Sequence, residues 1–332
     1  MKRRGVGIAC VLHPSGNKGA GDPSQAAIEL KPDGTFVLLI GAVDLGQGST
    51  TILRQVAADA LDVPIETIYA SNFGDDFAPL CTGSFASRVT LIDSHAVVNA
   101  AEDLKAKAKT FAAPMLGVEP EELEFADNKI FVRADPEKAL AMADLGGAVN
   151  WGADFIVGTG AWQPAPFQDH DPETGKMTAV AAIAFGTCVA EVEVDTETGE
   201  VELLKLVQVW DVGKAINPLM VRGQINGGLT IGMGFALTEA TYPFYPSPDF
   251  SPSNLDDYAV PTFADFPKEL EYGIVEVPKS AGVEGAIGFS EGSVNGPPPA
   301  IMSAIHDAVG VWIDQYPVTP ELILRALEAK EA

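Results

Sequence analysis

The 332-residue sequence contains few cysteines and few histidines, and neither type is clustered. Cys10, Cys81 and Cys188 are far apart and no CxxC pair occurs, so this chain alone cannot build an iron–sulfur cluster or a structural zinc site. No two of the four histidines have the spacing of metal ligands. We expect three buried, reduced thiols in a cytoplasmic protein.

Long apolar runs and an excess of positive charge are also absent. No segment approaches the ~20 apolar residues that a membrane helix needs, and the N-terminal MKRRGVGIACVLHPSG has no signal-peptide pattern. The net charge is −25 at pH 7. Nucleic acid and anionic membrane surfaces would be repelled, so we expect neither as a partner. A small-molecule substrate is not excluded, because a local site can oppose the overall charge.

Two nucleotide-binding signatures are missing as well. No GxGxxG follows a strand and no GxxxxGK[ST] occurs, which argues against a doubly wound nucleotide-binding fold. Hydrophobic periodicity instead predicts strands alternating with helices. The expected strands or hairpins cover 5–12, 28–43, the region around 127–128, and 188–213; the expected helices cover 49–63, 94–112, 223–240, 300–312 and 319–327. We predict a mixed α/β (α+β) fold in which antiparallel hairpins are interleaved with helices.

Residues 146–178 interrupt this pattern. They are rich in glycine, proline and aromatic residues and show little periodicity. A long structureless stretch is uncommon in a compact domain unless it is functional or covers a partner. We therefore expect two intertwined subdomains, 1–145 and 179–332, joined by an irregular segment at 146–178.

Three short stretches combine glycine with polar residues. Gly46-Gln47-Gly48 stands between an expected strand and an expected helix, where free backbone N–H groups suit an anion. Residues 82–88, TGSFASR, place hydroxyls beside Arg88, and residues 223–228, GQINGG, again put a glutamine among glycines. Taken singly, the first is explained more simply as a tight turn with a helix cap and the third as a helix-packing motif, while a polar loop explains the second equally well.

A fourth stretch holds one carboxylate in apolar surroundings. Residues 285–300 read GAIGFSEGSVNGPPPA, and Glu291 is their one charged residue. Desolvation raises the pKa of a carboxyl group, which makes it a better general base. A solvated surface residue is the alternative.

Together and in this order, the stretches resemble the molybdenum-binding subunits of the xanthine dehydrogenase and aldehyde oxidase family, the molybdenum hydroxylases. The resemblance covers nearly the whole chain and is weakest over about 120–178. The similar segments are DLGQGSTTILRQVAADALDVPIETI, TGSFASRVT, DVGKAINPLMVRGQINGGLTIGMGFALTE, NLDDYAVPTFADFP and GAIGFSEGSVNGPPPAIMSAIHDAVG. It implies the second half of the family's molybdopterin-binding domain.

The resemblance also implies the cofactor and the roles of individual residues. Molybdenum would be held through the dithiolene of a pterin, often the cytosine dinucleotide form in bacteria, with no metal ligand from this chain. Glu291 would be the general base that takes a proton from a water-derived ligand of the metal, whose oxygen is transferred to an electron-poor carbon. The residues implied to bind the cofactor are Gly46, Gln47, Gly48, Phe85, Ala86, Ser87, Arg88 and Gln224.

Two departures from the family pattern concern the glutamate loop, where Ile287 replaces a lysine and Ser290 a glycine. The family's N-terminal half, with its Gly-Gly-Phe-Gly-Gly-Lys stretch, has no equivalent here. The chain therefore resembles the medium molybdopterin subunit of a nicotinate dehydrogenase. This implies a larger molybdopterin subunit with the missing half, an iron–sulfur subunit and an FAD subunit.

The substrate class stays open between an N-heteroaromatic acid such as nicotinate, an aldehyde and a purine. A non-catalytic scaffold that closes the cofactor cleft of a partner is a further alternative. The candidates to line a substrate channel are His13, Phe85, Trp151, Phe155 and Trp162. For the tryptophans and Phe155 the simpler interpretation is packing, and for His13 an exposed loop position beside Pro14.

Overall fold

The computed structural model describes residues 1–331 except 18–20, 72–73, 75–76, 166–170, 241–253 and 257. Its strands and helices form two units, each made of separate segments of the chain. Unit 1 comprises Met1–His13, Ile183–Val277 and Phe289–Ala332, and unit 2 comprises Pro14–Ala182 and Pro278–Gly288. The mixed α/β fold agrees with the prediction, whereas the units do not follow the expected boundaries at 145 and 178.

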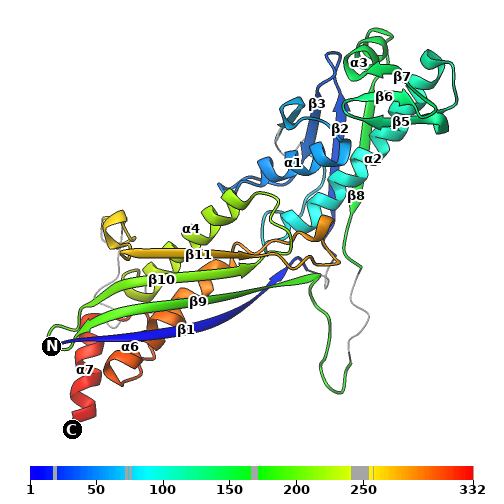
Figure 1. Cartoon of the computed structure of the whole chain (residues 1–332). Helices are drawn as coiled ribbons and strands as arrows, with labels where there is room; N and C mark the ends of the chain where they lie inside the picture. Colours follow the sequence, from blue (N-terminus) through cyan, green and yellow to red (C-terminus); the bar gives the residue numbers. More distant parts are fainter. Residues whose placement is uncertain are drawn as a thin grey trace. The chain divides into compact units, whose positions relative to one another are not determined.

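Unit 1 is a four-stranded sheet with helices on one side (Figure 1). The sheet order is β1-β9-β10-β11, with β9 and β10 antiparallel and β10 and β11 parallel. The strands are β1 (Lys2–Ser15), β9 (Ala182–Asp195), β10 (Val201–Asp211) and β11 (Glu269–Val275). The helices are α4 (Pro218–Leu237), α5 (Gly292–Asn295), α6 (Pro297–Val309) and α7 (Pro320–Glu331), with a 3-10 turn at Phe263–Asp265.

The alternating pattern of β1 explains how α6 packs. Gly5 and Gly7 are buried, and a Cβ on either would overlap the backbone of α6 at Ala304 or Ala300. The intervening Val6 and Ile8 face outward and are exposed. One face of the strand therefore contacts the helix directly, and the other is left open in this chain.

Unit 2 contains a second four-stranded sheet, β4-β3-β2-β8, and a small sheet, β5-β6-β7. Helix α1 (Ser49–Leu61) packs on α2 (Val89–Leu116), which lies along β2 and β8. The strands are β2 (Ser24–Leu30), β3 (Phe36–Ile40), β4 (Ile68–Ser71), β5 (Leu123–Ala126), β6 (Lys129–Val132), β7 (Asp135–Ala141) and β8 (Ile156–Trp162). The unit also holds α3 (Met142–Trp151) and 3-10 turns at Ile65–Thr67, Pro120–Glu122 and Val283–Gly285.

The predicted hairpins and helices are confirmed, but the description of 146–178 as irregular is wrong in part. Helix α3 ends at Trp151 and β8 occupies Ile156–Trp162, where it is an edge strand of the main sheet of unit 2. Gly158 and Gly160 of β8 lie directly under α2, since a Cβ on either would overlap its backbone at Ala100 or Ala96. These glycines gave the segment its loop-like composition, yet they serve close helix–strand packing.

The cysteines also differ from the expectation. All three are free thiols, but only Cys188 is buried, while Cys81 is half-buried and Cys10 is exposed on the outer face of β1. Burial raises the pKa of the Cys188 thiol to about 12. No helix within the described residues is long and apolar enough to cross a membrane.

Candidate functional site

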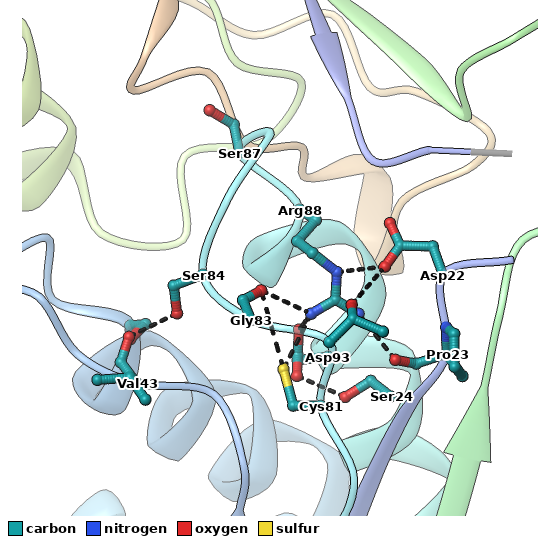
Figure 2. Close-up of polar contacts among 12 residues, drawn as sticks. Asp22, Pro23, Ser24, Val43, Cys81, Gly83, Ser84, Ser87, Arg88 and Asp93 are labelled. Atoms are coloured by element: carbon teal, nitrogen blue, oxygen red, sulfur yellow. Dashed lines mark hydrogen bonds and ion pairs between the residues drawn. The ribbon is translucent and has the colours of Figure 1, made fainter. Parts of the chain in front are cut away.

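In unit 2, the loop 82–88 is anchored by the buried side chain of Arg88 (Figure 2). Its guanidinium donates to Asp22 and, at 3.0 Å, to the Asp93 carboxylate near the start of α2. It also donates to the Pro23 carbonyl, the Gly83 carbonyl and the Cys81 sulfur. Both carboxylates are almost fully buried, so the arginine neutralises negative charge inside the fold.

This network was not predicted. Arg88 was expected to contact the cofactor, and all of the hydrogen bonds found for its side chain run to protein groups. The sequence offered one usable signal, Asp93, which follows Arg88 by five positions in the helix that begins after Arg88. Asp22 is 66 positions away and could not have been paired with Arg88 from the sequence. A cofactor contact for Arg88 remains a prediction.

The backbone of the same loop is held in an unusual conformation. Ala86 and Ser87 have φ values of 48° and 47°, in the left-handed region that L-residues seldom adopt. Their carbonyls accept hydrogen bonds from the Gly16 N–H and the Ser15 hydroxyl, both at 3.0 Å. Gly288 also lies against this loop, because a Cβ there would overlap the Ser87 carbonyl. The structure thus brings the 82–88 loop next to the beginning of the glutamate loop.

The turn that precedes α1 carries its own anion. The Asp44 carboxylate accepts hydrogen bonds from the backbone N–H groups of Gly46, Gly48 and Thr50 at 2.9–3.1 Å. Burial opposes ionisation of Asp44, but these hydrogen bonds outweigh it and lower the pKa of the carboxyl group. The backbone N–H groups that were expected to bind an anionic ligand therefore donate to a side-chain carboxylate, which is the arrangement of a capped turn.

The Gln47 side chain also forms hydrogen bonds within the turn. Its amide oxygen accepts from Leu45 N–H, and its Nε2 donates at 3.1 Å to the Val43 carbonyl and to the Ser49 hydroxyl. The Val43 carbonyl also accepts a hydrogen bond, at 2.6 Å, from the Ser84 hydroxyl (Figure 2). Two of the stretches singled out from the sequence therefore meet at one carbonyl oxygen.

In unit 1, Gln224 lies on α4 between positions that are open. Among the described residues, no atom other than the backbone of α4 itself and the chain neighbours lies within 4 Å of the place that a Cβ on Gly223 or Gly227 would take. Gly228 is different, because a Cβ there would overlap Ser293 of α5. The Gln224 carbonyl accepts from the Ser293 hydroxyl at 3.1 Å, which fixes α4 against α5.

Glu291 immediately precedes α5, and its carboxylate is not enclosed. The side chain is 54% exposed, so the expected desolvation by an apolar loop is not found in this chain alone. Its Oε2 lies 3.5 Å from Nε2 of His13, which ends the unit 1 part of β1. Ser290 supports the turn through its carbonyl, which accepts from the backbone N–H and the hydroxyl of Ser293.

His13 and two of the channel aromatics differ from their simplest interpretations. His13 is 7% exposed, so the expectation of an exposed loop residue is wrong. Trp162 does pack, stacking on His95 with ring centroids 4.2 Å apart. Trp151 and Phe155 are 88% and 65% exposed, so neither is a packing residue here, and Phe85 is also exposed.

The polar candidates therefore form one group in each unit. Unit 2 gathers the 46–50 turn, the 82–88 loop and Gly288, and unit 1 gathers Gln224, Ser293, Glu291 and His13. Among the described residues, no group of three or more acidic, histidine or cysteine side chains is placed to hold a metal.

The chain is similar in sequence and in fold to known proteins. Residues 1–267 match the family described as the molybdopterin cofactor-binding domain. The chain belongs to this family of molybdenum hydroxylases. It is 31% identical over 325 residues to the probable hypoxanthine oxidase XdhD of Escherichia coli strain K12, covering 98% of this chain and 32% of that protein.

Two further relatives support the same family. The chain is 30% identical over 338 residues to the nicotine 6-hydroxylase large subunit of Paenarthrobacter nicotinovorans, covering 98% of this chain and 40% of that one. The structure of quinoline 2-oxidoreductase from Pseudomonas putida 86 superposes with a TM-score of 0.83 at 25% identity, covering 98% of this chain and 42% of that chain. The molybdenum hydroxylase chain described here thus spans about a third to two-fifths of the length of these relatives.

The residues present suit a bulky polar cofactor. Both glutamines stand beside glycines with open surroundings, since Gly46, Gly223 and Gly227 have nothing within 4 Å of a Cβ position. A ligand can therefore approach the backbone next to Gln47 and Gln224. Phe85 offers an exposed ring within the 82–88 loop.

Proposed function

We propose that this chain is the base-bearing molybdopterin subunit of a multi-subunit molybdenum hydroxylase that oxidises an electron-poor carbon of an N-heteroaromatic substrate such as nicotinate. The observation that carries the proposal is the placement of Glu291. Its accessible carboxylate directly precedes α5, which is joined to the Gln224 helix through Ser293. A carboxylate used as a base must reach its proton, and an exposed one can.

The cofactor, bound as molybdopterin in its cytosine dinucleotide form, would supply the redox chemistry and the oxygen that is transferred. The protein residues would bind and orient it. Gln224 would donate from α4 to the pterin, the 82–88 loop would present its backbone and Phe85, and Gln47 would exchange part of its turn hydrogen bonds for the cofactor. Glu291 would accept a proton on its carboxylate and become neutral during oxidation.

The open position of Glu291 also bears on catalysis. In the isolated chain water reaches the carboxylate, since its side chain is 54% exposed. We propose that the cofactor and a partner subunit cover it in the complete enzyme, which would exclude competing water.

A partner is also supported by the outer face of the unit 1 sheet. Val6, Ile8 and Leu12 of β1 and Phe185 of β9 are each more than half exposed. An apolar patch of this kind typically marks a protein contact. We propose that a larger molybdopterin subunit, an iron–sulfur subunit and an FAD subunit complete a cytoplasmic enzyme with this chain.

The substrate assignment separates this proposal from its alternatives. A relative whose name states nicotine 6-hydroxylase and a structural neighbour that acts on quinoline both favour an N-heteroaromatic ring. Relatives named for hypoxanthine and aldehyde oxidation keep a purine or an aldehyde as a second candidate. A scaffold without a catalytic role would not need Glu291.

The deciding experiment replaces Glu291 with Gln in the complex purified from its native host. We expect unchanged subunit composition and molybdenum content, with turnover of nicotinate or the identified substrate lowered about 10²- to 10⁴-fold. Glu284→Gln, a change at the glutamate of the preceding 278–288 segment, is the matched control and should leave turnover near normal. Near-normal turnover of Glu291→Gln would remove Glu291 as the base, and a purified chain without molybdenum or partners would reject the whole proposal.

A further inference from the structure

His13 is a buried titratable side chain next to the proposed base, and the proposed function gives it no role. It ends the unit 1 part of β1, is 7% exposed, and its Nε2 lies 3.5 Å from Glu291 Oε2. The backbone between the two residues is tightly fitted, because a Cβ on Gly292 would lie 2.7 Å from His13 Cβ and 2.5 Å from the Trp210 ring. The base of the His13 side chain therefore packs closely against the backbone of the residue that follows Glu291.

Burial also determines the charge state of the imidazole. Desolvation lowers the pKa of His13, and the nearby negative charge of Glu291 opposes this without outweighing it. His13 is therefore neutral at pH 7, so it does not form a permanent ion pair. A neutral imidazole with its proton on Nε2 has an N–H to donate from this nitrogen, which lies 3.5 Å from the carboxylate oxygen.

The other unit 1 neighbours add no charge. Trp210 of β10 lies beside Gly292, and Gln208 of β10 donates to the Ser293 carbonyl. Cys188 of β9 lies beside Gly296 together with Val11, and its thiol stays protonated because burial raises its pKa to about 12. These neighbours leave the contact between the His13 imidazole and the Glu291 carboxylate without an added charge from β9 or β10.

We propose that His13 is a positioning residue for Glu291, which holds the carboxylate in one orientation and stabilises its ionised form by donating from Nε2. This inference rests on the proposed function, in which the ionised Glu291 is the base. An N–H donor favours the charged state of a carboxylate. Glu291 therefore stays ionised, and able to act as a base, down to a lower pH. A phenyl group at position 13 would remove this hydrogen-bond donor.

The first test uses the chain alone and does not depend on its activity. The histidine side chains are followed by ¹⁵N-edited NMR across pH 4–9, and His13→Gln identifies the signal of His13. We expect the wild-type His13 signal to titrate below the usual histidine range. Glu291→Gln should lower the pKa of His13 by a further ~0.5–1 unit, which is the effect of one charge at this distance when it is screened as in water. An unchanged His13 titration in Glu291→Gln overturns the pairing.

The second test uses the assembled, molybdenum-loaded complex and the pH dependence of kcat. His13→Phe removes the donor, so the acid limb should move to higher pH, since Glu291 is then protonated more readily. His13→Gln places an amide N–H near the former Nε2 and should restore the limb, while His306→Gln is the matched control and should leave it in place. An acid limb that stays unmoved in His13→Phe overturns the positioning role.

The two tests separate the possible failures. If the complex shows no hydroxylase activity, the proposed function fails while the NMR result still decides whether His13 and Glu291 interact. If His13→Phe does not fold, wild type and Glu291→Gln still give the NMR answer, and His13→Leu, which also removes the donor, replaces His13→Phe in the kinetic test. A purely structural histidine would reduce the yield of complex and leave the acid limb where it was.

Discussion

Arg88 shows how much one buried cation contributes to the candidate site. It is fully buried and neutralises Asp22 and Asp93, which are themselves buried. Replacing it with Met keeps most of its volume but leaves two carboxylates without a cation in a low-dielectric interior. We predict that Arg88→Met lowers the free energy of unfolding by about 3–5 kcal/mol, measured by chemical denaturation followed by circular dichroism.

The matched control for this change is a surface pair of the same type. Arg325 on α7 contacts Glu321 one helical turn away, and both side chains are more than 60% exposed. Arg325→Met should therefore cost less than about 1 kcal/mol. Equal losses for the two variants would show that the buried network does not hold the 82–88 loop.

At this scale the sequence predicted residue types better than their contacts. It picked out Gln47, Arg88, Gln224 and Glu291 because glycines and hydroxyls surround them. It could not reveal that Asp44 fills the expected anion seat or that Asp22 binds Arg88, because both depend on where the chain folds back. Burial of His13 was likewise beyond local patterns, since it depends on α5 and β10.

The turn before α1 depends on one carboxylate. Asp44 accepts from three backbone N–H groups at the start of the helix, which lowers its pKa despite partial burial. A pKa below the unfolded value of about 3.9 means that ionised Asp44 stabilises the fold above that pH, and this contribution is lost as the pH falls through the folded pKa. We predict that Asp44→Ala costs about 1–2 kcal/mol at pH 7.

The pH dependence provides the check for this prediction. Urea denaturation of wild type and Asp44→Ala at pH 7 and pH 3 should show a smaller difference at the lower pH. Asp59→Ala, on the exposed side of the same helix, should behave like wild type at both pH values. A stability difference that is the same at pH 3 and pH 7 would contradict the role of the ionised carboxylate.

Adjacent glycines of α4 give a second prediction for an element. Gly227 has open space around its Cβ position, whereas a Cβ on Gly228 would overlap Ser293. Gly227→Ala should therefore stabilise the isolated chain by about 0.5–1 kcal/mol through helix propensity. Gly228→Ala should destabilise it by about 1–3 kcal/mol through overpacking.

Measuring the thermal unfolding and molybdenum content of both variants tests why Gly227 is glycine. If the cofactor lies against α4 beside Gln224, Gly227→Ala should reduce molybdenum in the purified complex although the chain is more stable. Full molybdenum loading together with higher stability would show that the cofactor does not approach this part of the helix.

Individual elements were the part of the fold that the sequence predicted well. Alternating periodicity located the β9–β10 hairpin, and the helix expected at 319–327 is α7, before which the Thr319 hydroxyl accepts from Leu322 N–H. Strand β8 was missed because Gly158 and Gly160 read as loop residues. Glycine is needed at these positions because α2 approaches the strand closely. This tertiary contact cannot be read from the residues near β8 in the sequence.

The organisation of the whole chain was less predictable than its elements. The chain passes between the units near residues 13, 182, 277 and 288, so neither unit is a continuous segment. A boundary placed by composition, as at 146–178, assumes that neighbours in sequence fold together. Strand β1 contradicts this, because its last two residues belong to unit 2 while the rest belongs to unit 1.

This interweaving predicts how the molecule unfolds. The segment Pro278–Gly288 of unit 2 is held at both ends by unit 1, between β11 and α5, so loss of either unit disturbs the other.

The cysteines report on this directly, because Cys188 is buried in unit 1 and Cys81 is half-buried in unit 2. With iodoacetamide in increasing urea, we expect Cys10 to be alkylated throughout and the other two to become reactive together. Mass spectrometry of the labelled peptides gives the midpoint for each thiol, and Cys10→Ser controls for effects of the first modification. Clearly separated midpoints for Cys81 and Cys188 would mean that the units unfold independently, and the single cooperative transition expected from the four chain crossings would be wrong.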